Sequence, residues 1–422
     1  MAPGYQERPA AVEARGCGRA PAGVPETSTV QTPRVVTKSD ALDELAAEVR
    51  AAGRLALDTE FVWERTYRPK LGVVQVATDA SVAVIDAVEL HDLSPFFPVL
   101  HDPRVPVVLH GGAQDLEIFA SLMGEPVRGV VDTQIEGAFL GYWLQVGLST
   151  LLERVLKVHI KKDQTYTHWD RRPLRREQLA YAAEDVLHLL PLHDRLRAEL
   201  EGRGRVDWAE EEMRALEDPE RYTPVPPEER YQWVKGWQRL GGRELAILRE
   251  LAAWRERAAE RADIRPNFVA NDIVLTSLAA RPVETMEELR HVRGLASGAV
   301  ERHGRAILAA LRAGLACPSE RWPERAPRVR GRMPAPGLAP LLRAAVQAVA
   351  EREDIAPEVI ASGREIEALA SHGGKGEALD GLAVVRGWRR GLVGETLLAI
   401  ARGELAIAYD PERREVVTRG AR

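Results

Sequence analysis

Residues 55–61 read Leu-Ala-Leu-Asp-Thr-Glu-Phe, and this apolar stretch with two acids inside it decides the fold of the first half of the chain. Its length and apolar content are typical of a buried strand. Because side chains alternate across a strand, Asp58 and Glu60 share one face with Ala56, and their Cα atoms lie about 7 Å apart. Two partly desolvated carboxylates at that spacing repel each other, and a divalent cation would remove the repulsion. The alternative is an exposed edge strand whose acids are solvated.

The composition is that of an ordinary folded protein of two to four domains. Of its 422 residues, 45% are hydrophobic and 29% are charged, and no apolar run of the length needed to span a bilayer occurs. The only cysteines, Cys17 and Cys317, leave no disulfide framework and no cysteine zinc site, which favours the reducing cytoplasm. Residues 1–33 lack the apolar core of a secretory signal, so we expect a flexible tail there and no membrane segment.

Charge is divided unevenly along the chain. The net charge is −5, yet residues 230–330 hold 19 Lys and Arg against 12 Asp and Glu. This division is consistent with an acidic first half whose carboxylates bind metal and a basic second half that could bind phosphate. Arginine-rich, solvated helix surfaces are the alternative explanation for the basic half.

Several further elements surround the acidic strand. Residues 34–36, 71–77 and 82–85 predict strands, residues 40–52 an amphipathic helix, and residues 78–81 a hairpin turn, which together indicate a mixed sheet. Residues 105–109 are an apolar strand that ends before Gly111, and a helix carrying Asp115 in its first turn follows. Sites tend to form at the carboxyl ends of such strands. Simple compensation of the helix dipole is the other explanation for Asp115.

A later helix, residues 176–200, carries a second group of polar residues. Tyr181 and Asp185 are four positions apart and therefore share one helical face. Pro191 predicts a kink or break. His188 and His193 are expected to be exposed or to cap helices rather than to bind a ligand.

The loop at residues 161–173 mixes basic and aromatic side chains, among them Lys162, Trp169 and Arg172. Such a mixture can bind a nucleic-acid backbone electrostatically while its rings stack on bases. Packing of Trp169 against a helix is the alternative.

Asp58, Glu60, Asp115 and Asp185 supply only oxygen ligands, which select Mg²⁺ or Mn²⁺ over zinc. A pair of such ions stabilises both the attacking and the leaving oxygen when a phosphodiester is cleaved by in-line displacement. Asp58 is the natural bridging ligand. The hydroxyl of Tyr181 is a poor general base at neutral pH but could orient an activated water.

Three segments resemble, in order and spacing, the exonuclease motifs of the ribonuclease D family, which belongs to the tyrosine-type DEDD 3′-to-5′ exonucleases. They are residues 58–61, 110–116 and 181–186, and the resemblance covers roughly residues 34–205. It implies an RNase H-like mixed-sheet domain in which Asp58, Glu60 and Asp185 hold one metal ion, Asp58 and Asp115 hold the other, and Tyr181 positions the water. The residues expected to contact substrate are Phe61, His110, Lys162, Trp169 and Arg172.

The second half of the chain predicts a duplicated helical module. After the proline-rich boundary at residues 219–229 everything is expected to be helix and turn, and residues 263–270 are echoed by residues 354–361. Each copy resembles the HRDC module shared by ribonuclease D and RecQ-type helicases, the second in degenerate form. The expected α/β plus all-α architecture has an exonuclease domain at 34–218, helical bundles at 230–315 and 338–415, and a Pro/Arg-rich linker at 316–337.

The resemblance therefore predicts a 3′-to-5′ exoribonuclease that trims the 3′ trailers of structured RNA such as tRNA precursors and releases 5′-mononucleotides. The cysteine content predicts the cytoplasm, and a monomer is the default expectation for the oligomeric state. Two alternatives stay open. A DNA 3′-to-5′ exonuclease of the proofreading kind could use the same two-metal site, because that site does not distinguish sugars by itself. A non-catalytic RNA-binding protein could keep the fold, although it would be expected to lose at least one of the acids.

Overall fold

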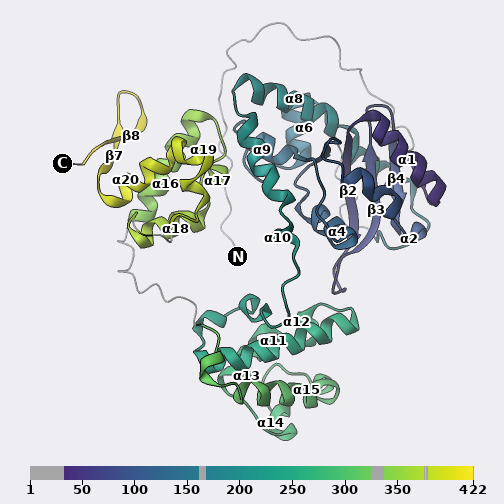
Figure 1. The fold of residues 1–422 in the computed structure, drawn as a ribbon, viewed down its shortest axis with the longest axis vertical. Coiled ribbons are helices and arrows are strands. Elements are labelled where there is room, and N and C mark those ends of the chain that lie inside the picture. Colours follow the sequence, from purple (N-terminus) through teal and green to yellow (C-terminus); the bar gives the residue numbers. More distant parts are fainter. Residues whose placement is uncertain (1–32, 161–167, 325–336, 375, 377–378, 422) are drawn as a thin grey trace. The chain divides into compact units, whose positions relative to one another are not determined.

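The computed structural model describes residues 33–160, 168–324, 337–374, 376 and 379–421, so nearly all of the expected tail lies outside it. Within these residues one six-stranded sheet has the order β1-β4-β3-β2-β5-β6 (Figure 1). Strand β3 is antiparallel to both of its neighbours, whereas the other adjacent pairs are parallel. The expected mixed sheet is confirmed. Its strands are β1 (Arg34–Val36), β2 (Leu55–Val62), β3 (Lys70–Ala77), β4 (Val82–Asp86), β5 (Val107–Leu109) and β6 (Val130–Asp132).

Helix α1 (Ser39–Ala52) covers one face of this sheet. Its buried side chains recur at helical spacing, and Leu42, Leu45 and Val49 join an apolar cluster with Leu55 and Leu57 of β2. The helix ends at a glycine in the left-handed region, where no side chain opposes the turn. The same face is packed by short helices and by α4, namely α2 (Ala87–Leu90), η1 (Ser94–Phe96), α3 (Phe97–Leu100) and α4 (Ala113–Met123).

The opposite face of the sheet is covered by helices from later in the chain. They are α5 (Thr133–Ala138), α6 (Leu148–Leu156), α7 (Arg176–Leu187), α8 (Leu189–Gly202) and α9 (Val206–Arg214). The break expected near Pro191 is found at His188, between α7 and α8. Pro191 itself lies in the first turn of α8, where a missing backbone N–H removes no intrahelical hydrogen bond. Two short elements follow, η2 (Ala215–Glu217) and α10 (Pro219–Tyr222).

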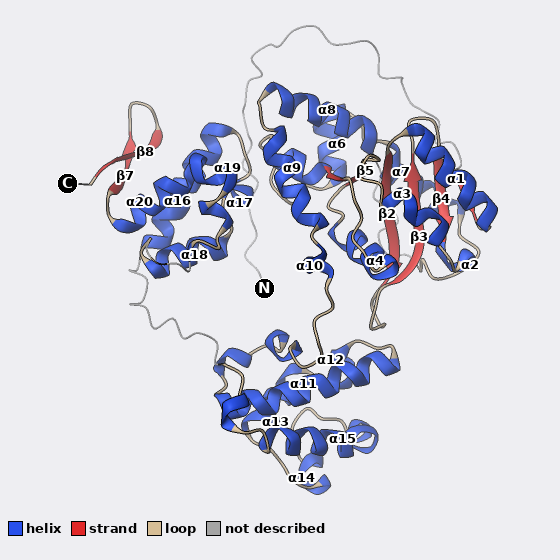
Figure 2. Ribbon diagram, viewed as in Figure 1, coloured by secondary structure: helices blue, strands red, loops and turns tan. Residues whose placement is uncertain are grey.

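The rest of the chain is mostly helical (Figure 2). The first bundle contains η3 (Arg230–Trp233), η4 (Trp237–Arg239), α11 (Gly242–Ala262), α12 (Pro266–Val269), α13 (Asp272–Ala280), α14 (Met286–Arg290), α15 (Ser297–Leu315) and η5 (Ser319–Arg321). The second contains α16 (Leu338–Glu353), α17 (Pro357–Ile360), α18 (Gly363–His372), η7 (Ala383–Val385), α19 (Gly387–Arg389), η8 (Arg390–Gly394) and α20 (Glu395–Arg402). Among the described residues no helix has both the length and the apolar content needed to cross a membrane.

The two bundles repeat the same local geometry. Asp263 and Asp354 both adopt left-handed backbone conformations after a long helix, with φ of 47° and 53°. A proline then begins the next short helix in each bundle. Asn271 and Ser362 follow as N-caps whose side chains accept a backbone hydrogen bond. The sequence repeat is therefore also a repeat of turns and caps.

The expectation that only helix and turn follow residue 229 is wrong at its end. Strands β7 (Leu405–Asp410) and β8 (Glu415–Gly420) form an antiparallel hairpin after α20. Both segments are short, both contain β-branched or aromatic residues, and a proline lies between them directly after Asp410, which is the pattern of a hairpin rather than of a helix.

Candidate active site

Asp58 and Glu60 lie on an interior strand. β2 is hydrogen-bonded to β3 on one side and to β5 on the other, so the edge-strand explanation for these acids does not hold. Both side chains are partly buried. The backbone register shifts between Glu60 and Phe61, at the end of β2 where the acids lie.

Asp115 reaches the same region from the neighbouring strand. β5 runs parallel to β2, so the turn after β5 and the start of α4 lie beside the carboxyl end of β2. Asp115 is buried in the first turn of α4, and the hydroxyl of Thr59 donates a hydrogen bond to its Oδ1. Thr59 thus ties the two acid-bearing elements together.

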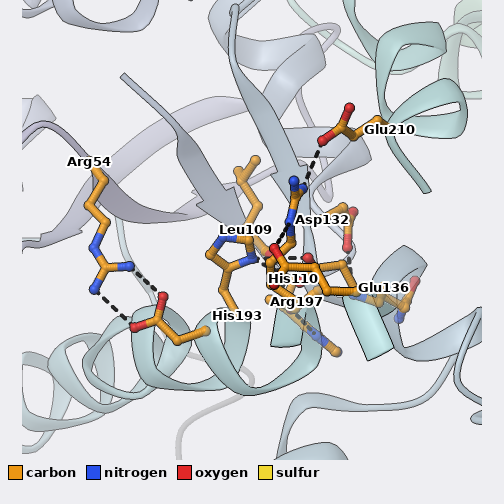
Figure 3. Close-up of polar contacts among 12 residues, drawn as sticks. Arg54, Leu109, His110, Asp132, Glu136, His193, Arg197 and Glu210 are labelled. Atoms are coloured by element: carbon orange, nitrogen blue, oxygen red, sulfur yellow. Dashed lines mark hydrogen bonds and ion pairs between the residues drawn. The ribbon is translucent and has the colours of Figure 1, made fainter. Parts of the chain in front are cut away.

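The turn that carries Asp115 is held from behind by Asp132, at the end of β6. Its carboxylate accepts hydrogen bonds from the backbone N–H groups of Gly111, at 2.9 Å, Gly112, at 3.2 Å, and Gln134, at 2.8 Å. Figure 3 shows Asp132 near His110 and Leu109, which both contact the Thr133 hydroxyl. Since Gly111 has a φ of 65°, the turn needs a residue that tolerates the left-handed region.

Tyr181 and Asp185 approach from α7, which packs across β2, β3 and β4. The buried Ala182 and Ala183 leave room for the helix to lie close to the sheet. The charge of Asp185 acts on the Tyr181 hydroxyl, which places the two side chains beside each other. As predicted from their spacing, the two side chains share one face of the helix.

The electrostatics of the site confirm that the four acids are neighbours. Burial, and then the charges of Asp115, Asp185 and Glu60, raise the pKa of Asp58 well above its ordinary value. Burial, Asp185 and Asp115 raise the pKa of Glu60 to about 8. Burial also raises the pKa of Asp115. Without a cation, ionising all four carboxylates together is therefore unfavourable.

The same desolvation and the charge of Asp185 raise the pKa of the Tyr181 hydroxyl further above its ordinary value of 10.0. Tyr181 is therefore protonated at neutral pH and acts as a hydrogen-bond donor and acceptor rather than as a base.

These residues fit a site for hard divalent cations. All four ligand candidates are carboxylates, and a bound cation would offset both the burial that raises the pKa values of Asp58, Glu60 and Asp115 and the repulsion that acts on Asp58 and Glu60. In the part of the chain that the structure describes, no group of three His, Cys, Asp or Glu side chains is placed so that it could hold one metal ion.

The residues expected to contact substrate differ in their exposure and in their contacts with the protein. Phe61 is partly exposed at the end of β2, and Lys162 lies outside the described residues. His110 already contacts protein through both ring nitrogens, at 2.9 Å from the Thr133 hydroxyl and 2.9 Å from the Val146 carbonyl. Its position supports a role in holding the turn before Asp115.

Trp169 and Arg172 do not have the exposure that substrate contact requires. Trp169 is 2% exposed and packs with Val73, Val84 and Ala182, so the alternative of packing against a helix is the correct one. A Cβ on Gly72 would lie 2.7 Å from the Trp169 carbonyl oxygen, which shows how closely this loop approaches β3.

Arg172 is bound by protein acceptors. Its guanidinium pairs with the buried Asp86 at 2.5 Å and donates to the backbone carbonyls of Gly72, at 2.9 Å, and Trp169, at 2.8 Å. The residue anchors its loop to the sheet. Its positive charge is already compensated, so an RNA-binding role for this side chain has no support.

Some residues near the site were not found from the sequence. Asp132 is one of them, although an aspartate between a strand and a helix is a common N-cap signal. His193 was expected to be exposed or capping, but it contacts the buried Glu136 at 3.0 Å (Figure 3). His188, in contrast, lies at the junction between α7 and α8. Thr59 lies between the two acids, and the sequence pattern assigns it no role.

A mixed sheet that brings four carboxylates and a tyrosine together at one strand end is the arrangement expected of a 3′-5′ exonuclease. Comparison with known families agrees with this class. Residues 33–201 match the 3′-5′ exonuclease family, and residues 244–311 match the HRDC domain. The match to HRDC falls in the first helical bundle.

Relatives of known function extend this similarity over nearly the whole chain. A ribonuclease D from Granulibacter bethesdensis is 36% identical over 403 residues, covering 93% of this chain and 98% of that protein. The ribonuclease D of Escherichia coli is 34% identical and covers 86% of this chain and 97% of its own length. The chain belongs to the ribonuclease D family, and it is a 3′-5′ exoribonuclease.

A solved structure supports the same assignment. The crystal structure of Escherichia coli RNase D, described as an exoribonuclease involved in structured RNA processing, is similar with a TM-score of 0.80 at 32% identity. The alignment covers 88% of this chain and 99% of that one. The architecture of an exonuclease domain followed by helical bundles is thus shared across the aligned length.

Proposed function

We propose that this exoribonuclease uses two divalent cations, Mg²⁺ or Mn²⁺, to remove nucleotides one at a time from the 3′ ends of structured RNAs such as tRNA precursors, releasing 5′-mononucleotides. One observation carries the metal dependence. Burial and the charges of Asp115 and Asp185 raise the pKa values of Asp58 and Glu60, so these two carboxylates lie among other acids. Such an arrangement is stable in the ionised form only when cations join it.

The proposed ligand roles follow from the positions of the acids. Asp58, whose pKa responds to all three other acids, would contact both ions. Glu60 and Asp185 would complete one site, and Asp115 would complete the other. When bound, the cations would activate a water and stabilise the charge that develops on the scissile phosphate.

Tyr181 would hold the attacking water in line with the phosphorus atom. Its hydroxyl is protonated and lies beside Asp185, so it has both a proton to donate and lone pairs that can accept from a water. Orientation of this kind lowers the barrier because the water does not have to be ordered during the reaction.

We also propose that both helical bundles help to hold the RNA, with the second, at 338–415, as a degenerate HRDC-like module. The matching left-handed aspartates and the matching N-caps at Asn271 and Ser362 support the duplication. The domain limits that accompany this proposal are 34–218 and 230–315, with the linker at 316–337. Monomeric and cytoplasmic states are part of the same proposal, the latter resting on the small number of cysteines.

The deciding experiment uses the full chain and a 5′-labelled tRNA with a short 3′ extension. In Mg²⁺ or Mn²⁺ we expect stepwise shortening from the 3′ end and release of 5′-mononucleotides, and EDTA should stop it. A matched tRNA lacking the extension controls for trimming beyond the mature end. If metal-stripped protein shortened the RNA at the full rate, the two-metal proposal would be wrong.

A DNA 3′-to-5′ exonuclease is the second candidate, because the acids alone do not distinguish sugars. A single-stranded DNA of the same sequence tests it in the same assay. Hydrolysis of DNA as fast as RNA would favour this second function. The membership in the ribonuclease D family favours RNA.

A further inference from the structure

Gln75, on β3, is a buried polar residue that the active-site assignment leaves unexplained. Its side chain is 0% exposed, and neither its amide nitrogen nor its amide oxygen has a hydrogen-bond partner among the described residues. Buried amide groups are nearly always hydrogen-bonded, because losing water without a replacement is unfavourable. A glutamine kept in this environment therefore calls for a functional explanation.

The sheet register places Gln75 next to the proposed metal ligands. In the antiparallel pairing of β2 with β3, Gln75 lies directly opposite Asp58. Directly opposite residues point to the same face, with their Cβ atoms about 4.5 to 5.5 Å apart. The amide of Gln75 therefore starts beside the carboxylate of Asp58, on the sheet face that α7 covers with Tyr181 and Asp185.

The surroundings of Gln75 are otherwise apolar. On its other side it pairs with Val84 of β4, and Val73 precedes it by two positions on the same face. These two valines pack with Ala182 and Trp169, whose indole N–H is also buried without a partner among the described residues. The two groups are complementary, because the indole N–H only donates and the amide oxygen accepts, although neither has a partner among the described residues.

We propose that Gln75 is a positioning residue for the metal site and that its amide N–H₂ donates a hydrogen bond to the carboxylate of Asp58 once cations hold that carboxylate. The amide has no partner among the described residues, so its side chain rotates to make the bond when the cations bind. Asp58 would use one side of its carboxylate for the cations and present the other to Gln75. The hydrogen bond fixes the rotation of the Asp58 carboxylate and stabilises its negative charge, which lies among three other acids. Carboxylates that bind metal ions are commonly held by such outer hydrogen bonds, whose removal weakens metal affinity or activity by about 10- to 100-fold.

This inference rests on the proposed metal site, and the test separates the two. Mn²⁺ alone is titrated into the full-length protein, and free Mn²⁺ is followed by electron paramagnetic resonance. If the unaltered protein binds no Mn²⁺, the metal-dependent function fails, whatever Gln75 does. If it binds Mn²⁺ and Gln75 variants bind it equally well, the proposal for Gln75 alone is overturned.

The variants are chosen to separate positioning from packing. Gln75→Leu and Gln75→Met both remove the amide at similar size, and Met also keeps the unbranched shape in case Leu does not fold. We expect Mn²⁺ affinity to fall about 10- to 100-fold. The unfolding temperature in EDTA should stay the same or rise, because an amide without partners has been replaced by apolar atoms.

Val76→Ala is the matched control, because Val76 is the next residue of β3 and packs in the core of the opposite face. It should lower the unfolding temperature and leave Mn²⁺ affinity unchanged. Equal loss of Mn²⁺ affinity in Val76→Ala would attribute the effect to damage of the strand and overturn the proposal. Trp169→Phe, which removes only the indole N–H, should weaken Mn²⁺ binding less than Gln75→Met.

Discussion

Two groups of buried or partly buried acids occupy the same domain and differ in their surroundings. Asp86 pairs with Arg172, Asp132 accepts three backbone N–H groups, and Glu136 contacts His193. Asp58 and Glu60, by contrast, are surrounded by further carboxylates that raise their pKa values. Acids of the first group hold the fold together. Acids of the second group lower the stability of the fold when they are ionised, and we explain their presence by the cations that they are proposed to bind.

Replacing Asp58 by asparagine should give the largest effect and the sharpest contrast. Because Asp58 is proposed to contact both ions, Asp58→Asn should lower the single-turnover rate of 3′ nucleotide removal by on the order of 10³-fold or more. The unfolding temperature in EDTA should be unchanged or higher, because one repelling carboxylate is gone. Substantial residual activity with intact Mn²⁺ binding would contradict the bridging role.

Tyr181→Phe is expected to have the second largest effect. Loss of the hydroxyl should lower turnover by about 10- to 100-fold and leave RNA affinity nearly unchanged, because orientation of the water matters in the transition state. Steady-state rates and a binding titration in Ca²⁺ would separate the two quantities. Unchanged turnover would remove Tyr181 from the mechanism.

Asp132→Asn tests the first group of acids and should act on stability instead. Asparagine keeps one acceptor but turns an N–H₂ toward a backbone N–H, so we expect the free energy of unfolding to fall by about 1 to 3 kcal/mol. Chemical denaturation measures the change. Activity should fall less than in Asp58→Asn, through loosening of the Gly111 turn before Asp115. A rate loss as large as that of Asp58→Asn, without any loss of stability, would erase the distinction between the groups.

The smallest expected effect is a pH dependence of the metal-free protein. Glu60 holds its proton up to about pH 8 when folded, against an ordinary value of 4.5. Between these values the folded state binds more protons than the unfolded state, so stability should fall as pH rises. Melting curves in EDTA at about pH 5.5 and 8.5 measure this difference, and saturating Mg²⁺ should remove or reverse it because cations bind the ionised form. A stability in EDTA that rises across this range would contradict the assigned electrostatics.

Much of the site could be predicted from local pattern. The alternation of residues 55–61, the turn before Asp115 and the four-residue spacing of Tyr181 and Asp185 each depend on short-range geometry, which sequence expresses directly. The end of the chain was mispredicted because a hairpin of two short strands gives a weak signal beside long helices.

Side chains whose role depends on distant partners could not be assigned in this way. Trp169 and Arg172 lie in a loop whose composition suits nucleic acid, yet one is packed under α7 and the other is bound to Asp86. The same limit applies to His193, whose partner Glu136 is 57 positions away.

By itself, the sequence determined which acids share a face of a strand or helix, because strand and helix periods place side chains on defined faces. Only the tertiary structure decided which acids face cations or N–H groups and which face one another, since that depends on strand order and on the packing of α7 over the sheet. Asp58 and Asp86 illustrate the physical reason. Both are acids on strands of one sheet, and the identity of the nearest charge, a carboxylate for one and an arginine for the other, is set by contacts between segments far apart in the chain.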